Sequence, residues 1–281
     1  MKLLRYGKAG NEKPGILDAD GQIRDLSNHV SDVNPNALST EELARLSEID
    51  VFSLPVVDGK PRLGPCLADV GKIVCIGLNY HDHAKEVGKS APSEPMIFMK
   101  ATTSICGPND PVEVPRTSQT TDWEVELGIV IGKRAKYVEE NNALQHVAGY
   151  LCINDVSERS FQADRQGQWT KGKSHDTHGP IGPYLVTADE VRDPHALRLW
   201  TEVDGVMRQD SSTDQMVFSV GSIVSYLSQF MTLEGGDIIA TGTPAGVGKG
   251  IKPEPVYLKP GSILRCGIEG LGEQEHTMVA A

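Results

Sequence analysis

Residues 123–131 read Trp-Glu-Val-Glu-Leu-Gly-Ile-Val-Ile, a stretch in which acidic and apolar side chains alternate. Because successive side chains of a β-strand point to opposite faces, Glu124 and Glu126 share one face, and Val125, Leu127 and Ile129 share the other. One interpretation is a strand with a solvated outer face. The other is a buried pair of carboxylates, which at ~4 Å and an effective dielectric constant of about 20 repel by about 4 kcal/mol and therefore need a cation or a proton.

Strands dominate the chain on both sides of this stretch. Apolar runs typical of strands lie at 73–76, 96–99, 147–153, 198–207, 237–240 and 262–268, with Asp204-Gly205 as a hairpin turn. The clearest helix covers residues 216–230, with Thr213 or Asp214 as its cap. Strands do not alternate strictly with helices, so the sequence predicts a mixed α/β fold that is mostly β and mostly antiparallel.

The first 70 residues are expected to form a small N-terminal α+β domain, and residues 71–281 a catalytic domain. Strand-like pieces at 2–6 and 22–26 accompany a helix that Ser39 opens, with Glu42 three residues later as in a capping box. Residues 54–67 are rich in proline and glycine and are expected to connect the two domains.

Composition excludes several classes of protein. The chain has 281 residues, with 27 basic against 38 acidic residues and a formal net charge of −11. It contains no dense run of Lys or Arg, so we expect no nucleic-acid partner. No segment has the apolar length of a signal peptide or a membrane span, so we expect a soluble cytoplasmic protein. The five cysteines form no CxxC pair, and buried free thiols are expected.

A third carboxylate, Asp155, follows the apolar run 147–153, where a strand gives way to a helix that starts near Ser157. Asp155 either caps that helix or joins Glu124 and Glu126. Three carboxylates without a thiol suit Mg²⁺ or Mn²⁺ rather than zinc.

A second polar cluster covers residues 77–88. If Asn79 caps a short helix, His83 and Glu86 are neighbours at i, i+3, and the carboxylate can orient the imidazole as a general base. The alternatives are a surface ion pair, or His81 and His83 as metal ligands.

A glycine-rich stretch at 241–250 does not complete either nucleotide-binding motif. We expect a turn whose backbone amides line a pocket together with the Thr243 hydroxyl. His175 and His178 lie in a loop, where histidines usually face solvent.

Taken together, these segments resemble the catalytic domain of the fumarylacetoacetate hydrolase family over about residues 72–268. The matching segments are GLNYHDHAKE (77–86), PMIFMK (95–100), DWEVELGIVIG (122–132), GYLCINDVSERSFQ (149–162), KGKSHDTHGPIGPYLVT (171–187) and the segment 218–248 that ends in ATGTPAGVG.

The resemblance implies a β-roll fold and assigns roles to individual residues. Glu124, Glu126 and Asp155 would bind Mg²⁺ or Mn²⁺, His83 and Glu86 would activate water, and Lys173 would bind charge or donate a proton. The residues that would contact the substrate are Arg159, Gln162, Thr243, Tyr80 and Lys100. Ser160, His175 and His178 depart from the family pattern, and we expect them to make the pocket more polar.

The expected function is that of a metal-dependent hydrolase that cleaves the C3–C4 bond of a 2,4-diketo acid to pyruvate and a hydroxy acid. The polar departures favour a 2,4-diketo-3-deoxy sugar acid such as 2,4-diketo-3-deoxy-L-rhamnonate. The alternatives are acylpyruvate hydrolase, oxaloacetate decarboxylase, ureidoglycolate lyase, or a metal-dependent keto-acid binder without turnover. The resemblance also favours a homodimer or homotetramer.

Overall fold

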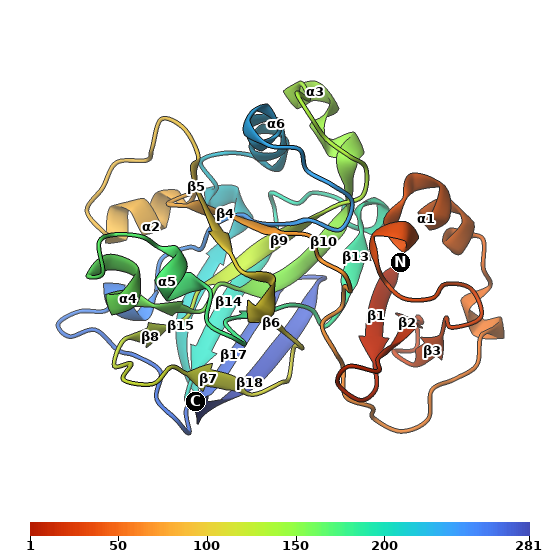
Figure 1. Cartoon of the computed structure of the whole chain (residues 1–281), viewed down its shortest axis with the longest axis horizontal. Coiled ribbons are helices and arrows are strands. Elements are labelled where there is room, and N and C mark those ends of the chain that lie inside the picture. The colour runs from red at the N-terminus through yellow and green to blue at the C-terminus, as the bar shows by residue number, and fades with distance from the viewer.

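The largest element of the fold is a nine-stranded sheet, seen in a computed structural model that describes residues 1–281 (Figure 1). Its strands, in spatial order, are β3 (Ile23–Asp25), β2 (Lys13–Leu17), β1 (Lys2–Tyr6), β13 (Leu185–Thr187), β10 (Val147–Asn154), β9 (Val125–Ile131), β16 (Ile238–Ala240), β4 (Ile73–Gly77) and β5 (Met96–Lys100). Within this sheet, only β16 and β4 are paired in parallel.

A second sheet has five strands, in the order β15 (Val206–Ser212), β14 (Arg198–Val203), β17 (Ile263–Ile268), β18 (Gly272–Ala280) and β7 (Val112–Val114). Two strand pairs lie apart from it: β8 (Thr121–Asp122) with β11 (Ser157–Glu158), and β6 (Ile105–Cys106) with β12 (Gly179–Pro180). Asp204 and Gly205 both have positive φ, at 51° and 78°, and form the predicted hairpin turn. The prediction of a mixed, mostly antiparallel β fold is confirmed.

Six α-helices cover or connect the strands: α1 (Thr40–Ser47), α2 (His81–Glu86), α3 (Glu140–Ala143), α4 (Arg159–Ala163), α5 (Thr170–Lys173) and α6 (Val220–Phe230). The predicted start of α6 was wrong, because Ser219, and not Thr213 or Asp214, accepts the capping hydrogen bond from the Ser222 amide. None of these helices has the length and apolar character needed to cross a membrane.

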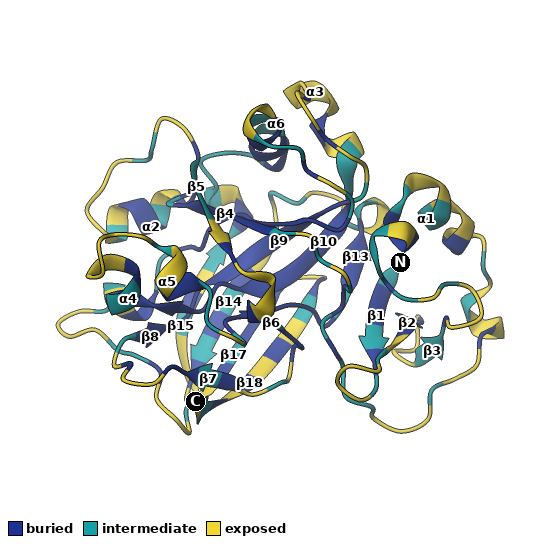
Figure 2. Cartoon of the chain, in the orientation of Figure 1, coloured by how far each residue is buried: buried dark blue, intermediate teal, exposed yellow.

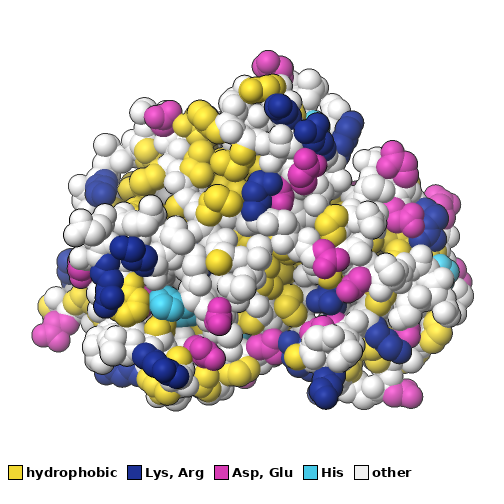
Figure 3. Space-filling view, in the orientation of Figure 1, with side chains coloured by type: hydrophobic (Ala, Val, Ile, Leu, Met, Phe, Trp, Pro, Cys, Tyr) yellow, Lys and Arg dark blue, Asp and Glu magenta, His cyan; other side chains and the backbone are white.

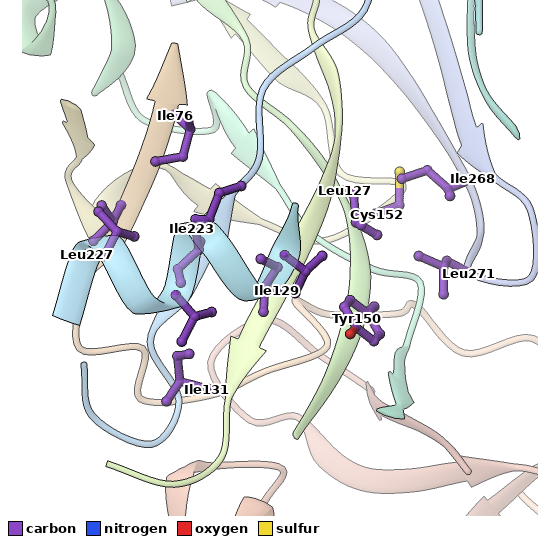
Figure 4. Close-up of a cluster of buried hydrophobic side chains, with 14 of the residues drawn as sticks. Ile76, Leu127, Ile129, Ile131, Tyr150, Cys152, Ile223, Leu227, Ile268 and Leu271 are labelled. Atoms are coloured by element: carbon purple, nitrogen blue, oxygen red, sulfur yellow. The ribbon is translucent and has the colours of Figure 1, made fainter. Parts of the chain in front are cut away.

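The core lies on both faces of β9. Val125, Leu127 and Ile129 belong to the cluster beneath α6, where Ile223 and Leu227 pack against the sheet (Figure 4). On the opposite face, Val130 packs with residues of β10 and of the N-terminal segment. A strand that is covered on both sides cannot have a solvated face, so any acidic side chain on β9 is buried.

The N-terminal segment forms a lobe at the right of Figure 1, and its strands extend the large sheet through the pairing of β1 with β13. Ser39 caps α1 as predicted, but the carboxylate of Glu42 pairs with Arg45 instead of completing a capping box. Apolar side chains of this lobe share one buried cluster with β4 and β9. The domain boundary near residue 70 stays a prediction.

Burial is greatest in the central strands, whereas the lobe and the outer loops are more exposed (Figure 2). On the face shown in Figure 3, acidic and basic side chains are interspersed, and Lys and Arg side chains gather over α4 and α5. All five cysteines are free and buried, as predicted.

Candidate active site

Three buried carboxylates converge where β9 and β10 lie side by side. Ile153 is paired with Glu126, and the Asp155 amide donates a hydrogen bond of 2.8 Å to the Glu124 carbonyl. One oxygen from each of Glu124, Glu126 and Asp155 lies within 4.8 Å of the others, and the residues are 7%, 1% and 0% exposed. The solvated face is therefore excluded for the two glutamates. Asp155 is not a helix cap either, because Glu158 caps α4.

Three cations surround this triad. The Lys173 ammonium lies 2.7 Å from Glu124 Oε2 and 2.6 Å from Asp155 Oδ2, and the Lys100 ammonium lies 2.5 Å from Asp155 Oδ1. Arg159 donates through Nη1 to Glu124 Oε1 at 2.5 Å. These ion pairs neutralise Glu124 and Asp155 but do not reach Glu126.

Burial alone would raise the pKa of Glu124, but Lys173 and Arg159 outweigh burial and lower this pKa to about 2. Burial would likewise lower the pKa of Lys173, yet Asp155 and Glu124 hold it above its ordinary value. The pKa of Glu126 is raised by burial and then by the charges of Asp155 and Glu124. The one hydrogen bond to the Glu126 side chain comes from the Gly242 amide, at 2.8 Å.

Arg159 is shared with the neighbouring Asp122, so three cations serve four carboxylates and the site lacks one positive charge. A proton or a cation would supply that charge, and three carboxylates without sulfur or imidazole form a donor set that suits a hard divalent ion. The residues present thus fit the metal that the sequence suggested.

The predicted dyad is formed on α2. His83 Nδ1 lies 2.8 Å from Glu86 Oε2, and Glu86 Oε1 accepts a hydrogen bond of 2.8 Å from the Gly246 amide. Because the carboxylate accepts, Nδ1 carries the proton, and the lone pair of a neutral ring is on Nε2. A Cβ at Gly250 would lie 2.5 Å from the Glu86 carboxyl carbon, so glycine at this position lets the carboxylate keep its place. The surface-pair alternative does not hold, because His83 is 9% exposed and lines a cavity.

One detail of the prediction for α2 was wrong. Asn79 does not cap this helix, which begins after Tyr80 without a side-chain cap. The Asn79 side chain is fully buried and bonds instead to the Phe218 backbone and the Thr241 carbonyl. It thereby joins the start of α2 to the segments before α6 and after β16.

A single cavity of about 500 Å³ is lined by both dyad residues and by two members of the triad, Glu124 and Glu126, whereas Asp155 lies behind them and does not line it. It is lined by eight of the predicted residues: His83, Glu86, Glu124, Glu126, Arg159, Gln162, Lys173 and Thr243. A cavity of this size holds a small organic molecule. Arg159 Nη2 is buried and has no hydrogen-bond partner, so it has a donor to offer to a ligand.

Two other predicted substrate contacts, Tyr80 and Lys100, do not line this cavity. Tyr80 is fully buried in the core beneath α6, and Lys100 lies behind Asp155 and donates to the Val156 carbonyl as well. Thr243 does line the cavity, but its hydroxyl already donates to the Val125 carbonyl and accepts from Gln209.

The prediction that the departures from the family pattern make the pocket more polar was wrong. Ser160 hydrogen-bonds to Glu158, and His178 bonds to the Glu113 carbonyl. The His175 ring packs between those of Phe161 and His178. None of the three departing residues lines the cavity, and burial lowers the pKa of His178 to about 3, so this ring is neutral.

Sequence reasoning missed Asp122. Its carboxylate accepts from Arg159 Nε at 2.7 Å and from the amides of Gly248 and Lys249 at 2.6 and 3.0 Å, and it thereby fixes both the arginine and the glycine-rich turn. The signal was present, because Asp122, Glu124 and Glu126 follow one another at intervals of two residues. Trp169 and Phe98, which form an apolar wall of the cavity, had no such signal.

Comparisons of the sequence and of the fold with known proteins assign the chain to a family. The fumarylacetoacetate (FAA) hydrolase C-terminal model matches residues 72–279. A protein of Burkholderia lata named "Putative hydrolase" is 60% identical over 278 residues, which cover 99% of both chains.

Among solved structures, the fumarylacetoacetate hydrolase of Exiguobacterium antarcticum is 38% identical with a TM-score of 0.87, over the full length of both chains. Maleylpyruvate hydrolase from Sphingobium sp. SYK-6, solved with manganese(II) and pyruvate, is 28% identical with a TM-score of 0.83 over the same full lengths. A 2-hydroxyhepta-2,4-diene-1,7-dioate isomerase from Mycobacterium marinum is 33% identical with a TM-score of 0.76, covering 100% of this chain and 98% of the other. The chain therefore belongs to the fumarylacetoacetate hydrolase family, and its nearby structures include both hydrolases and isomerases.

Proposed function

We propose that this protein is a metal-dependent hydrolase that cleaves the C3–C4 bond of a 2,4-diketo acid to pyruvate and a carboxylic acid. The observation that carries the proposal is that one cavity is lined both by the histidine–glutamate dyad and by two carboxylates of the triad, one of which, Glu126, has no cationic partner. The related maleylpyruvate hydrolase, crystallised with manganese(II) and pyruvate, supports the choice of metal and product.

Glu124, Glu126 and Asp155 would hold Mg²⁺ or Mn²⁺, which would polarise the oxygens of a 2-oxo acid as a Lewis acid. Arg159 would bind the substrate carboxylate through its free Nη2. A guanidinium with one unpaired buried donor gains most from an anionic acceptor, because a charged donor left unpaired in the protein interior is costly.

The dyad would carry the hydrolytic step. His83 Nε2 would take a proton from water while Glu86 keeps Nδ1 protonated and the ring in place. The hydroxide would add to the C4 carbonyl, and the electron pair of the C3–C4 bond would pass to C3, which takes up a proton to complete pyruvate. Lys173, held charged by Glu124 and Asp155, would stabilise the negative charge that develops on the pyruvate half.

The rival reactions differ in their need for the dyad. Oxaloacetate decarboxylation, ureidoglycolate cleavage and keto-acid binding without turnover do not require an activated water, whereas hydrolysis of a diketo acid or an acylpyruvate does. The buried histidine, whose carboxylate partner is fixed at both oxygens, favours hydrolysis. An isomerase, as in the Mycobacterium marinum structure, would use the same base to move a proton between carbon atoms.

The test is a panel of 2,4-diketo acids, oxaloacetate and ureidoglycolate with metal-stripped protein, to which Mg²⁺ or Mn²⁺ is added back. 2,4-Diketo-3-deoxy sugar acids join the panel on the resemblance alone, because Ser160, His175 and His178 do not line the cavity. We expect pyruvate release from a diketo acid that EDTA abolishes and either metal restores. Full turnover by metal-stripped protein in EDTA would refute the metal assignment, and turnover of oxaloacetate alone would refute hydrolysis.

A further inference from the structure

Three lysines at the mouth of the cavity have no role in the proposed reaction. Lys89, Lys249 and Lys252 line the cavity, are exposed, and take part in none of the ion pairs of the structure. In a chain with a net charge of −11, three unpaired cations at one opening reverse the prevailing sign of charge. A cavity edged by charges of one sign concentrates ligands of the other sign.

The buried end of the cavity differs in its charge balance. Lys173 is paired with Glu124 and Asp155, and Arg159 is paired with Asp122 and Glu124. Apart from the free Nη2 of Arg159, the cations available to a ligand are therefore those at the mouth. They lie at the end where the tail of a bound 2-oxo acid would emerge.

One wall of the cavity is apolar. Phe98 and Trp169 meet edge to face with their ring centroids 5.1 Å apart, and both line the cavity. Aromatic faces bind a carbon chain well and offer little to hydroxyl groups. The cavity thus combines one free buried donor on Arg159, an apolar wall and three exposed lysines.

We infer that the cavity selects 2-oxo acids whose far end carries a second anionic group, and that Lys89, Lys249 and Lys252 bind that group. This inference rests on the proposed function, in which the buried end takes the 2-oxo acid. A neutral hydroxylated tail would leave the three lysines without a counter-charge and would place hydroxyls against Phe98 and Trp169. Specificity would come from charge at the mouth rather than from polar groups in the pocket.

The test is titration calorimetry of the Mn²⁺-loaded protein with stable six-carbon 2-oxo acids that differ in their tails. 2-Oxoadipate ends in a carboxylate, 2-oxohexanoate has the same number of carbons and ends in a methyl group, and 2-keto-3-deoxygluconate ends in neutral hydroxyls. We expect 2-oxoadipate to bind about tenfold tighter than either of the others at low salt, since three exposed ion pairs each contribute a small factor. The advantage should shrink as ionic strength rises.

Variants assign the effect to the lysines. Changing Lys89→Gln, Lys249→Gln and Lys252→Gln together should remove the advantage of 2-oxoadipate and leave the affinity for 2-oxohexanoate unchanged. The corresponding triple change to arginine should keep the advantage. Lys60→Gln, an exposed lysine of the N-terminal lobe that does not line the cavity, is the matched control and should have no effect.

The possible results separate the two proposals. Equal affinities of the wild type for 2-oxoadipate and 2-oxohexanoate would overturn the inference and leave the proposed function standing. The inference would also be wrong if the glutamine variant lost both ligands equally, because the lysines would then act on the shared 2-oxo carboxylate. Binding of none of the three acids by the metal-loaded protein would overturn the proposed function, and the inference with it.

Discussion

Glu126→Gln should stabilise the metal-free protein, because it removes the one carboxylate of the triad that has no cationic partner. At 4.8 Å, the largest separation within the triad, two carboxylates repel by about 3.5 kcal/mol at an effective dielectric constant of 20. Lys173 offsets part of this repulsion between Glu126 and its two neighbours. Glutamine has nearly the same shape and can still accept the hydrogen bond from the Gly242 amide.

Protonation sets an upper limit to the gain. The pKa of Glu126 is raised in the folded protein, so its contribution to stability is fully present below the unfolded pKa of ~4.3 and is lost as pH rises through the folded pKa. A glutamate kept protonated at pH 7 therefore costs at most about 3.7 kcal/mol, and at pH 5 at most about 1 kcal/mol. We expect Glu126→Gln to stabilise the metal-free protein by about 1–3 kcal/mol at pH 7 and by less than about 1 kcal/mol at pH 5.

Urea unfolding in EDTA at both pH values measures the difference through the midpoint at constant slope. With Mg²⁺ at one hundred times its dissociation constant, the wild type should gain about 2.7 kcal/mol, and the variant should gain much less. A variant that is less stable than the wild type at pH 7 in EDTA, or a difference that does not change between pH 5 and pH 7, would show that Glu126 carries no uncompensated charge.

Three further changes test the other parts of the site. His83→Ala should lower kcat by about 10²–10⁴ while the Mn²⁺-loaded protein still binds oxalate like the wild type; loss of oxalate binding in calorimetry would make His83 a binding residue. Gly250→Ala should displace the Glu86 carboxylate and lower kcat about tenfold or more without changing metal affinity, whereas unchanged kcat would show that Glu86 need not be held in place. Lys100→Met should cost about 3–5 kcal/mol of stability in EDTA, because it leaves the Asp155 carboxylate with one cationic partner fewer. Added Mg²⁺ should recover part of this loss. An equal loss of stability with and without Mg²⁺ would contradict the coupling between Lys100 and the metal.

Periodicity located the strands whose buried residues are apolar. The run at 123–131 and the run at 147–153 became β9 and β10, because alternation and continuous apolar character are both typical of strands. Alternation alone is typical of a strand with one solvated face, so it did not indicate that β9 is covered on both sides. The same reasoning missed β18, whose inward-facing positions include Gln274 and His276. Gln274 is buried because it donates to three backbone carbonyls, which a hydrophobicity pattern cannot indicate.

The site residues could be predicted from the sequence where their spacing along one strand or helix sets their relative positions. They were harder to predict where contacts between distant segments set those positions. The spacing of Glu124 and Glu126, and of His83 and Glu86, follows from strand and helix geometry. Asn79 was assigned to the wrong partner because its hydrogen bonds join segments more than a hundred residues apart. Hydrogen bonds between segments so far apart leave no pattern in the local sequence from which they could be predicted.

The charge balance of the triad explains why this site can be both folded and functional. If Lys100 and Lys173 were absent, three buried carboxylates would repel one another and oppose folding. If a further lysine neutralised Glu126, a divalent ion would gain little by entering. With one carboxylate left uncompensated, the metal-free protein bears a cost that protonation limits to a few kcal/mol, and a bound ion removes that cost. The same residual charge that lowers stability without metal therefore supplies part of the affinity for it.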